Sequence, residues 1–395
     1  MLRASSSEAV LARLSGSQAG HLADSGVATP LSAHWLFVYL YIFIVSLVLA
    51  LSLTPIFRWL SFRWGFVDQP DSERKLHAHA MPLLGGCAIF GAFAANVLLN
   101  YLLILPLSSQ INLPLVELPD LRPYIEGAFS VWQKLVVLLL GGFLMLLLGM
   151  YDDKYELKAW IKLLGQAFIG AGTWLAGMQI MHFMATPVLS LVLTVLWIVT
   201  ITNAMNFLDN MDGLCAGLGL VCSLLFGLIA GIQHQYFVCI LSVAFAGALM
   251  GFLPYNFKPA KIFLGDAGSH CVGYILAVLP IIVTFYRHNQ PTRLSVLIPL
   301  LVLGVPLFDL VTVTYIRLRK GRPIYVGDTN HISHRLVQIG LPQRWAVVAI
   351  YLITLTLGLG ATVLLWAGWT AAFIVIVQAL CILALVTLLE HFGHK

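Results

Sequence analysis

Eleven long apolar runs constrain this chain more than any other feature. They cover roughly 35–57, 84–106, 131–150, 161–179, 187–204, 214–233, 236–254, 269–286, 294–316, 346–366 and 370–390. A helix of about 20 apolar residues crosses the roughly 30 Å of hydrocarbon in a bilayer. The runs are continuous, whereas strands of a membrane barrel alternate between apolar and polar residues. The sequence therefore predicts an all-α, polytopic membrane bundle of about eleven transmembrane helices.

Composition supports this prediction, because 60% of the 395 residues are hydrophobic and only 10% are charged. A soluble domain carries about 25% charged residues, so the bilayer must serve as the solvent for this chain. Residues 1–33 are polar and lack an apolar core, which predicts a disordered tail rather than a cleaved signal peptide. Residues 34–391 are expected to form one membrane-embedded domain.

The distribution of Lys and Arg predicts the orientation of the bundle. Sixteen of the 22 basic residues fall on the side that holds the loop after the first run. Cytoplasmic loops carry the excess of Lys and Arg in membrane proteins. This side is therefore predicted to be cytoplasmic, with the N-terminus outside and the C-terminus inside.

Five connections on the predicted cytoplasmic side hold nearly all the unusual polar residues. They are Arg74–His79, Gly149–Lys154 with Lys162 beyond it, Asn203–Gly213, Phe263–Ser269 and Asp328–Leu336. Such residues at the ends of membrane spans are typical of a site that faces water on one side of the bilayer.

The third connection repeats an oxygen-bearing side chain at every third position: Asn203, Asn206, Asp209 and Asp212. This spacing keeps the four side chains on one side of a helix end or of the turn that follows it. Mg²⁺ prefers such oxygens, usually one or two from protein with water and substrate phosphate. Helix capping is the ordinary role of Asn and Asp, but four in register favour function.

Three further clusters suit phosphate chemistry. Asp152 and Asp153 are adjacent carboxylates whose repulsion a cation would offset, and Lys162 opens the next run. Asp266 lies among small residues immediately before a predicted helix, where glycines permit a close approach of backbone to ligand. Solvation or capping is the simpler explanation for each alone. In the fifth connection, His331 and His334 can donate to phosphate oxygens or carry protons, and Arg335 can bind phosphate.

In this order the five segments resemble the polyprenyl-phosphate N-acetylhexosamine-1-phosphate transferase family, over about residues 35–345. Members of that family move a sugar 1-phosphate from a UDP-sugar to a polyprenyl phosphate and release UMP. They need Mg²⁺ or Mn²⁺ and act at the cytoplasmic face of the plasma (inner) membrane. The resemblance implies the same substrates, cofactor and location here, together with contacts to membrane lipids; a homodimer is an option, and nucleic acid is not an expected partner.

The resemblance also implies roles for single residues. Asp266 matches the principal metal ligand, and Asn206 matches a second. Asp152 and Asp153 match an aspartate pair proposed to orient or deprotonate the lipid phosphate, and Lys162 matches a lysine that contacts the pyrophosphate.

The remaining matched residues are implied to surround the substrates. Those expected to bind substrate are Lys75, His77, Asn203, Asp209 and Asp212, of which the last is associated with uracil in the family. Those expected in the loop that closes over the pyrophosphate and sugar are His331, His334 and Arg335. Ser333 replaces a histidine that is common between the outer two, so a role for that middle histidine is lost here.

The sugar donor and the function class each have alternatives. A branch of the family that uses UDP-MurNAc-pentapeptide has three successive histidines and then an acidic residue, which this chain lacks. That difference favours UDP-GlcNAc, with a GalNAc or diamino-sugar nucleotide as the alternative. A secondary transporter would place its polar residues near the middle of the bilayer, and a structural scaffold would bind no nucleotide.

Overall fold

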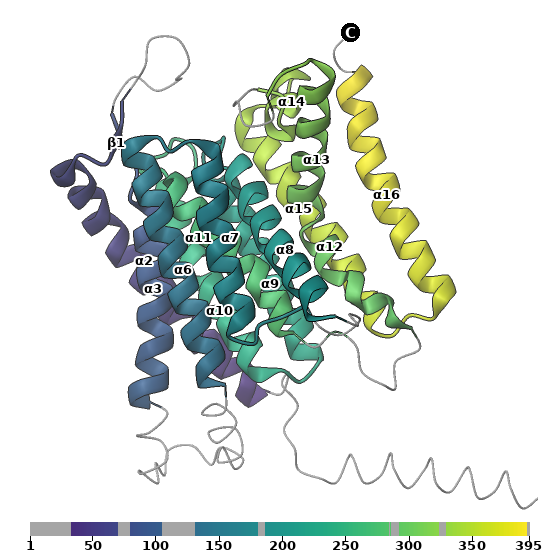
Figure 1. Cartoon of the computed structure of the whole chain (residues 1–395), viewed down its shortest axis with the longest axis horizontal. Coiled ribbons are helices and arrows are strands. Elements are labelled where there is room, and N and C mark those ends of the chain that lie inside the picture. Colours follow the sequence, from purple (N-terminus) through teal and green to yellow (C-terminus); the bar gives the residue numbers. More distant parts are fainter. Residues whose placement is uncertain are drawn as a thin grey trace, which may run out of the picture.

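The computed structural model describes residues 33–69, 80–104, 131–180, 186–283, 285, 292–323 and 329–392 of the chain. The helices are α2 Ala33–Trp64, α3 Gly85–Leu99, α6 Trp132–Tyr155, α7 Ala159–Leu175, α8 Pro187–Phe207, α9 Leu214–Ile232, α10 Tyr236–Asn256, α11 Gly265–Ile282, α12 Ile298–Val302, α13 Gly304–Arg319, α14 Ile332–Gln338, α15 Gln343–Thr362 and α16 Trp369–Phe392. A π-helical turn, Asn100–Ile104, extends α3, and short 3₁₀ turns, Arg293–Leu297 and Val363–Leu365, precede α12 and follow α15. Most of these helices lie side by side as one bundle (Figure 1).

The predicted polytopic helical bundle is confirmed. Within the described ranges, nine helices are long and apolar enough to cross a membrane, and the bent pair Arg293–Val302 and Gly304–Arg319 makes a tenth. The remaining predicted run, 161–179, corresponds to α7, which has 17 residues. At 1.5 Å per residue that helix is about 25 Å long, close to the thickness of the hydrocarbon. Of the predicted N-terminal tail, residues 1–33, only Ala33 is described, and it is the first residue of α2.

One predicted span is not straight. The run 294–316 was expected to be a single helix, but the structure bends by 68° between Val302 and Gly304. Pro306 lies in the first turn of α13 and has no N–H to donate to the carbonyl of Val302. The regular hydrogen bonding of one helix therefore cannot continue into the next.

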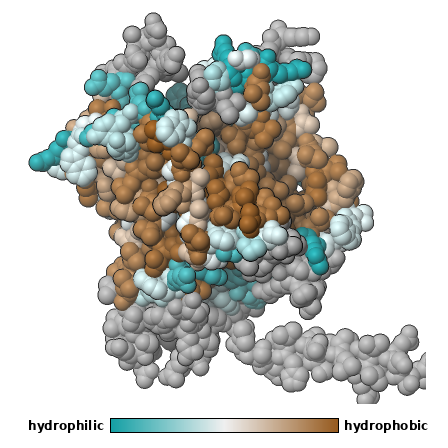
Figure 2. Space-filling model, viewed as in Figure 1, coloured by the Kyte–Doolittle hydropathy of each residue, from teal (hydrophilic) through white to brown (hydrophobic). Residues whose placement is uncertain are grey.

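The outer surface of the bundle suits lipid. Hydrophobic residues form a band across the middle of the molecule, and hydrophilic residues gather at its two ends (Figure 2). Large apolar side chains are exposed on the described helices, among them Phe168, Leu175 and Val188, which are 80%, 75% and 71% exposed. An exposed apolar surface of this extent indicates contact with a membrane.

Helix α11 lies at the centre of the bundle and packs against α3, α6, α8 and α9. It is 83% buried and has a mean hydropathy of 1.3, whereas the peripheral α16 is 22% buried and has a mean hydropathy of 2.9. Glycines allow its start to approach two neighbours. A Cβ at Gly86 of α3 would lie 2.3 Å from Gly268 Cα, and a Cβ at Gly149 of α6 would lie 2.3 Å from the carbonyl oxygen of Asp266. The start of α11 is therefore held in backbone contact with α3 and α6.

A short strand pair closes the connection before α3. Strands β1 Val67–Asp68 and β2 Met81–Pro82 are antiparallel, and Val67 is paired with Pro82. This pair and α14 lie at the same end of the bundle, at the top of Figure 1. Lys75 and His77, predicted to bind substrate, fall between the two strands and lie outside the described residues.

The orientation of the bundle remains a prediction, which cysteine labelling would test. In a background without native cysteines, Cys replacing Ser72, Lys154, Lys258 or Asn330 should resist an impermeant thiol reagent added to intact cells. The exposed His234, in the turn between α9 and α10, is the matched control and should label as Cys. Labelling of any two of the four test positions from outside would reverse the assignment.

Candidate active site

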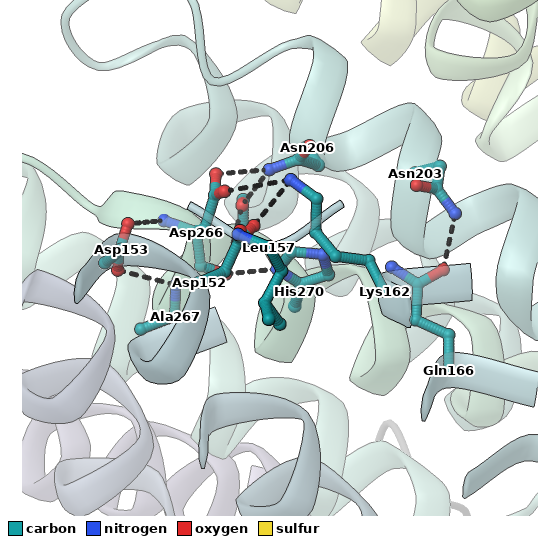
Figure 3. Close-up of polar contacts among 11 residues, drawn as sticks. Asp152, Asp153, Leu157, Lys162, Gln166, Asn203, Asn206, Asp266, Ala267 and His270 are labelled. Carbon is teal, nitrogen blue, oxygen red and sulfur yellow. Dashed lines mark hydrogen bonds and ion pairs between the residues drawn. The ribbon is translucent and has the colours of Figure 1, made fainter. Parts of the chain in front are cut away.

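An ion pair joins the end of α6 to the beginning of α7. Lys162 Nζ lies 2.5 Å from Asp152 Oδ2 and 3.6 Å from Asp266 Oδ2 (Figure 3). Asp152 also closes its own helix, because its Oδ1 accepts a hydrogen bond of 2.8 Å from the N–H of Leu157. The lysine therefore sits between two carboxylates that come from helices far apart in the sequence.

Asp153 points to the start of α11 instead. Its Oδ1 and Oδ2 accept hydrogen bonds from the backbone N–H groups of Asp266, at 2.8 Å, and Ala267, at 3.1 Å. No side chain of its own segment caps α11. A carboxylate at a helix N-terminus satisfies free N–H groups and interacts favourably with the helix dipole. Asp153 thus caps α11 from the neighbouring helix.

Backbone conformation at Gly265 makes room for this cap. The residue has a φ of +74°, and a Cβ here would lie 2.8 Å from Asp153 Oδ2. Glycine adopts positive φ without steric cost. A side chain at this position would both strain the turn and displace the capping carboxylate.

The Asp266 side chain faces the ion pair and α8. Asn206 Nδ2 donates to Asp266 Oδ1 at 2.7 Å and to Ser269 Oγ at 2.9 Å. His270 Nδ1 lies 2.6 Å from the carbonyl oxygen of Asp266, one helical turn earlier. The side chain of Asp266 is 34% exposed, whereas that of Asp152 is 3% exposed. Of these two carboxylates, Asp266 is the one that a ligand from solvent can reach. In contrast to the sequence expectation, it lies in the first turn of α11 and not before the helix.

The cluster offers the oxygens that a divalent cation such as Mg²⁺ prefers. In the part of the chain described, no three or more Asp, Glu, His or Cys residues are arranged to hold an ion by themselves. Mg²⁺ commonly takes one or two protein carboxylates and completes its shell with water and substrate phosphate. The donor set around Asp266 fits that mode. Asn206 presents its amide nitrogen to Asp266, so its oxygen would bind a metal only after the amide turned over.

The four regularly spaced side chains from Asn203 to Asp212 lie in two different environments. Asn206 contacts the carboxylate of Asp266, and Asp209 lies within electrostatic range of Asp266 and Asp153. Burial raises the pKa of Asp209 well above its usual range, and the nearby negative charges of Asp266, Asp153 and Asp212 raise it further. Asp209 therefore belongs to the same cluster.

The other two members of that run have structural partners. Asn203 donates to Gln166 Oε1 at 2.6 Å, which ties α8 to α7. Asp212 Oδ2 accepts from the N–H of Ala260 at 3.1 Å, which ties the turn before α9 to the segment before α11. The regular spacing thus brings two of the four side chains to the cluster and uses two to hold its surroundings.

The basic residues predicted near the pyrophosphate lie at the start of α14: His331 immediately precedes the helix, and His334 and Arg335 lie within it. His331 Nδ1 lies 2.7 Å from Asp309 Oδ2, and the N–H of Ile332 donates to Asp309 Oδ1 at 2.6 Å. Arg335 Nη2 donates to Thr312 Oγ1 at 3.2 Å. His331 and His334 lie near each other, with 6.5 Å between their ring centroids. Asp309 was not among the predicted site residues, although a carboxylate inside an apolar run is itself a signal of function.

Phe207 connects α14 to the carboxylate cluster. It directly follows Asn206 at the end of α8. The edge of one ring meets the face of the other between Phe207 and His331, with centroids 5.6 Å apart, and the Arg317 guanidinium lies 5.0 Å from the centroid of the Phe207 ring. The acidic cluster and the basic segment therefore meet at one end of α8.

Known proteins are similar to this chain in sequence over most of its length. The profile of glycosyl transferase family 4 matches residues 135–284, from the first turn of α6 to just beyond the end of α11. A Bacillus subtilis (strain 168) protein, named a probable undecaprenyl-phosphate N-acetylglucosaminyl 1-phosphate transferase, is 35% identical over 345 residues, covering 85% of this chain and 87% of that protein. The chain belongs to glycosyl transferase family 4.

Two further relatives bear on which branch of family 4 this transferase resembles. The decaprenyl-phosphate N-acetylglucosaminephosphotransferase of Mycolicibacterium smegmatis is 32% identical over 380 residues, or 89% of this chain and 87% of that protein. The phospho-N-acetylmuramoyl-pentapeptide-transferase of Lactiplantibacillus plantarum is 34% identical over 181 residues, only 39% of this chain and 52% of that protein. The two N-acetylglucosamine enzymes are similar to this chain over most of its length. The muramoyl enzyme is similar to it over less than half of its length.

Proposed function

We propose that this protein transfers N-acetylglucosamine 1-phosphate from UDP-GlcNAc to a polyprenyl phosphate, such as undecaprenyl phosphate, and releases UMP. The observation that carries the proposal is the meeting of acidic and basic groups at one end of α8. Relatives named for N-acetylglucosamine transfer, matched over most of their length, support the choice of sugar and lipid.

In the proposed reaction, an oxygen of the lipid phosphate attacks the β-phosphorus of UDP-GlcNAc. The bond from that phosphorus to the oxygen of UMP breaks, and UMP leaves with the electron pair. Lys162 carries the positive charge nearest Asp152 and Asp266, and we assign it to the pyrophosphate. The acceptor phosphate has a second pKa of about 6 and is already ionised near neutral pH. The chain therefore needs to position the acceptor more than to deprotonate it.

We assign a Mg²⁺ ion, or Mn²⁺ in its place, to Asp266, with Asn206 and Asp209 beside it. Such an ion, when bound, neutralises negative charge that builds on the pyrophosphate oxygens. His331, His334 and Arg335 are assigned to the phosphate and sugar side. The guanidinium of Arg335 is a charged donor, which can form strong hydrogen bonds to phosphate. The excess of Lys and Arg at this end supports a site at the cytoplasmic face of the inner membrane.

A secondary transporter fits these observations less well. The bent span of α12 and α13 is a feature of transporters. However, Asp309 in that span has both carboxylate oxygens engaged by α14. The acidic groups of the cluster, Asp152, Asp153 and Asp266, lie at helix ends, where substrates from water and membrane could meet.

Purified protein assayed with undecaprenyl phosphate and a panel of UDP-sugars tests the proposal. UDP-GlcNAc should yield UMP and lipid-linked sugar in equal amounts, more rapidly than UDP-GalNAc, a diamino-sugar nucleotide or UDP-MurNAc-pentapeptide. Removal of divalent cations should stop turnover, and Mg²⁺ should restore it. A faster rate with UDP-GalNAc or the diamino-sugar nucleotide would show that the donor sugar is not GlcNAc. Failure of every donor, or release of UMP without lipid, would reject the function.

A further inference from the structure

The carboxylate of Asp309 is a charge enclosed within the bundle. The residue is 0% exposed and lies in the middle of α13, one turn after the bend of this span. An ionised carboxylate is costly to bury unless its oxygens are hydrogen-bonded and its charge is compensated. A residue kept under this cost usually has a task that an apolar residue could not perform.

The carboxylate of Asp309 contacts the start of α14. One oxygen lies 2.7 Å from His331 Nδ1, and the other accepts the N–H of Ile332, the first residue of α14, at 2.6 Å. His331 precedes that helix and has no side-chain cap bond of its own. Asp309 therefore holds both the ring and the backbone at the point where the basic segment begins.

A carboxylate at Nδ1 also determines the chemistry of the other ring nitrogen. Because Asp309 Oδ2 can only accept when ionised, Nδ1 carries the proton and Nε2 is left for a further partner. A buried aspartate that fixes a histidine in this way is known to control tautomer and orientation in other enzymes. The His331 ring also touches Phe207, the residue next to Asn206. This contact fixes the position of the His331 ring relative to the carboxylate cluster.

A second contact holds the same segment. Ser333 Oγ donates to Asn210 Oδ1 at 2.6 Å, and Asn210 Nδ2 donates to the carbonyl of Phe207 at 2.7 Å. α14 is thus attached to α13 through Asp309 and to the turn after α8 through Asn210. Both attachments are made by the first two residues of α14 and the one before it.

We propose that Asp309 is a positioning residue of the active site, which fixes the tautomer of His331 and the place of α14 over the carboxylate cluster. The proposal rests on the proposed function, in which His331 serves the phosphate and sugar side. Asp309 touches no substrate itself and acts through His331. An Asn at position 309 keeps an acceptor for Ile332 but offers an N–H to Nδ1, so that the imidazole is driven to the opposite tautomer.

A double-mutant cycle tests this assignment. Asp309→Asn should lower kcat by about tenfold to a hundredfold, the effect typical of a group that orients a functional histidine, with a smaller change in KM. His331→Asn retains an N–H near the position of Nδ1 and lacks Nε2; it should fold normally and lose a similar factor. In the His331→Asn background, Asp309→Asn should cost less than about threefold, because coupled residues are not additive.

Controls separate positioning from folding. Thr354→Val removes a buried hydroxyl bonded only within α15 and should leave kcat unchanged. Full additivity in the cycle, or full activity of His331→Asn, would overturn the assignment. If Asp309→Asn fails to fold, the test rests on the folded His331→Asn variant, whose full activity would overturn the assignment.

Hydrogen exchange gives a readout that needs no substrate. Backbone amides of residues 329–340 should exchange faster in Asp309→Asn than in wild type, while those of α9 stay the same. Should wild type fail to turn over any UDP-sugar, the proposed function is rejected and exchange decides the positioning: unchanged exchange at 329–340 overturns it. Should wild type turn over and the cycle be additive, only the role of Asp309 is rejected.

Discussion

Asp266→Asn should abolish turnover while the protein still folds and inserts. Asp266 is the more exposed of the two carboxylates paired with Lys162, and it is the one to which we assign the proposed Mg²⁺. Asn can still accept the hydrogen bond from Asn206, so the packing of α8 on α11 should persist. Even groups that only support a metal ligand cost about 10–100-fold when removed. We therefore expect a loss of more than about a hundredfold in UMP release at saturating Mg²⁺.

Glu156→Gln is the matched control for this loss. Glu156 is an exposed acid in the turn that follows Asp152 and Asp153. Its neutralisation changes the net charge as Asp266→Asn does and should leave the rate near that of wild type. If Asp266→Asn kept more than a tenth of the wild-type rate, Asp266 would not be the main ligand.

Asp153→Asn should produce a second large defect, one that does not change with pH. An amide has one acceptor oxygen, so one of the two N–H groups that Asp153 now caps would face an N–H of Asn instead. Loss of a helix cap costs about 1 kcal/mol, which should lower Tm. The displacement of Asp266, next to the lost cap, should lower kcat/KM for the lipid by about tenfold or more.

The pH profile distinguishes this positioning role from base catalysis. If Asp153 removed a proton from the acceptor, its loss would be relieved as rising pH ionised the lipid phosphate. With a second pKa of about 6, that phosphate is mostly dianionic over most of the range from pH 6 to 9. The ratio of wild-type to Asp153→Asn rates should stay nearly constant there. Asp152→Asn, measured alongside, removes the carboxylate that pairs with Lys162 instead. Progressive recovery of the rate of either variant at high pH would show that the replaced aspartate acts as a general base.

The sequence was a good guide to the helices, because hydrocarbon thickness and backbone hydrogen bonding dictate long apolar runs. It was a weaker guide to their shape. The bend before α13 depends on Pro306, and a proline inside an apolar run can kink, break or merely be accommodated. The start of α11 at Gly265 was placed four residues late because glycine, aspartate and serine read as a turn.

Within the site, residue types were more predictable than contacts. Asp152, Asp266 and Lys162 do come together, although they lie on three helices. The spacing of Asn203 and Asp212 could not reveal that Gln166 and the backbone of Ala260 hold them, since those partners are remote in sequence. Asp309 was missed because the surrounding apolar run was interpreted only as a membrane span.

The central place of α11 also bears on how the protein is made. Helices with the lowest mean hydropathy are stabilised least by contact with lipid. Among the nine described helices that are long and apolar enough to cross a membrane, α11 has the lowest mean hydropathy, 1.3. Its main neighbours, α3, α6, α8 and α9, all precede it in the chain. When α11 leaves the ribosome, the helices that receive it have therefore already been synthesised. We therefore expect these helices to assist the insertion of α11. The ion pair between Lys162 and Asp266 can form only after α11 has packed into the bundle.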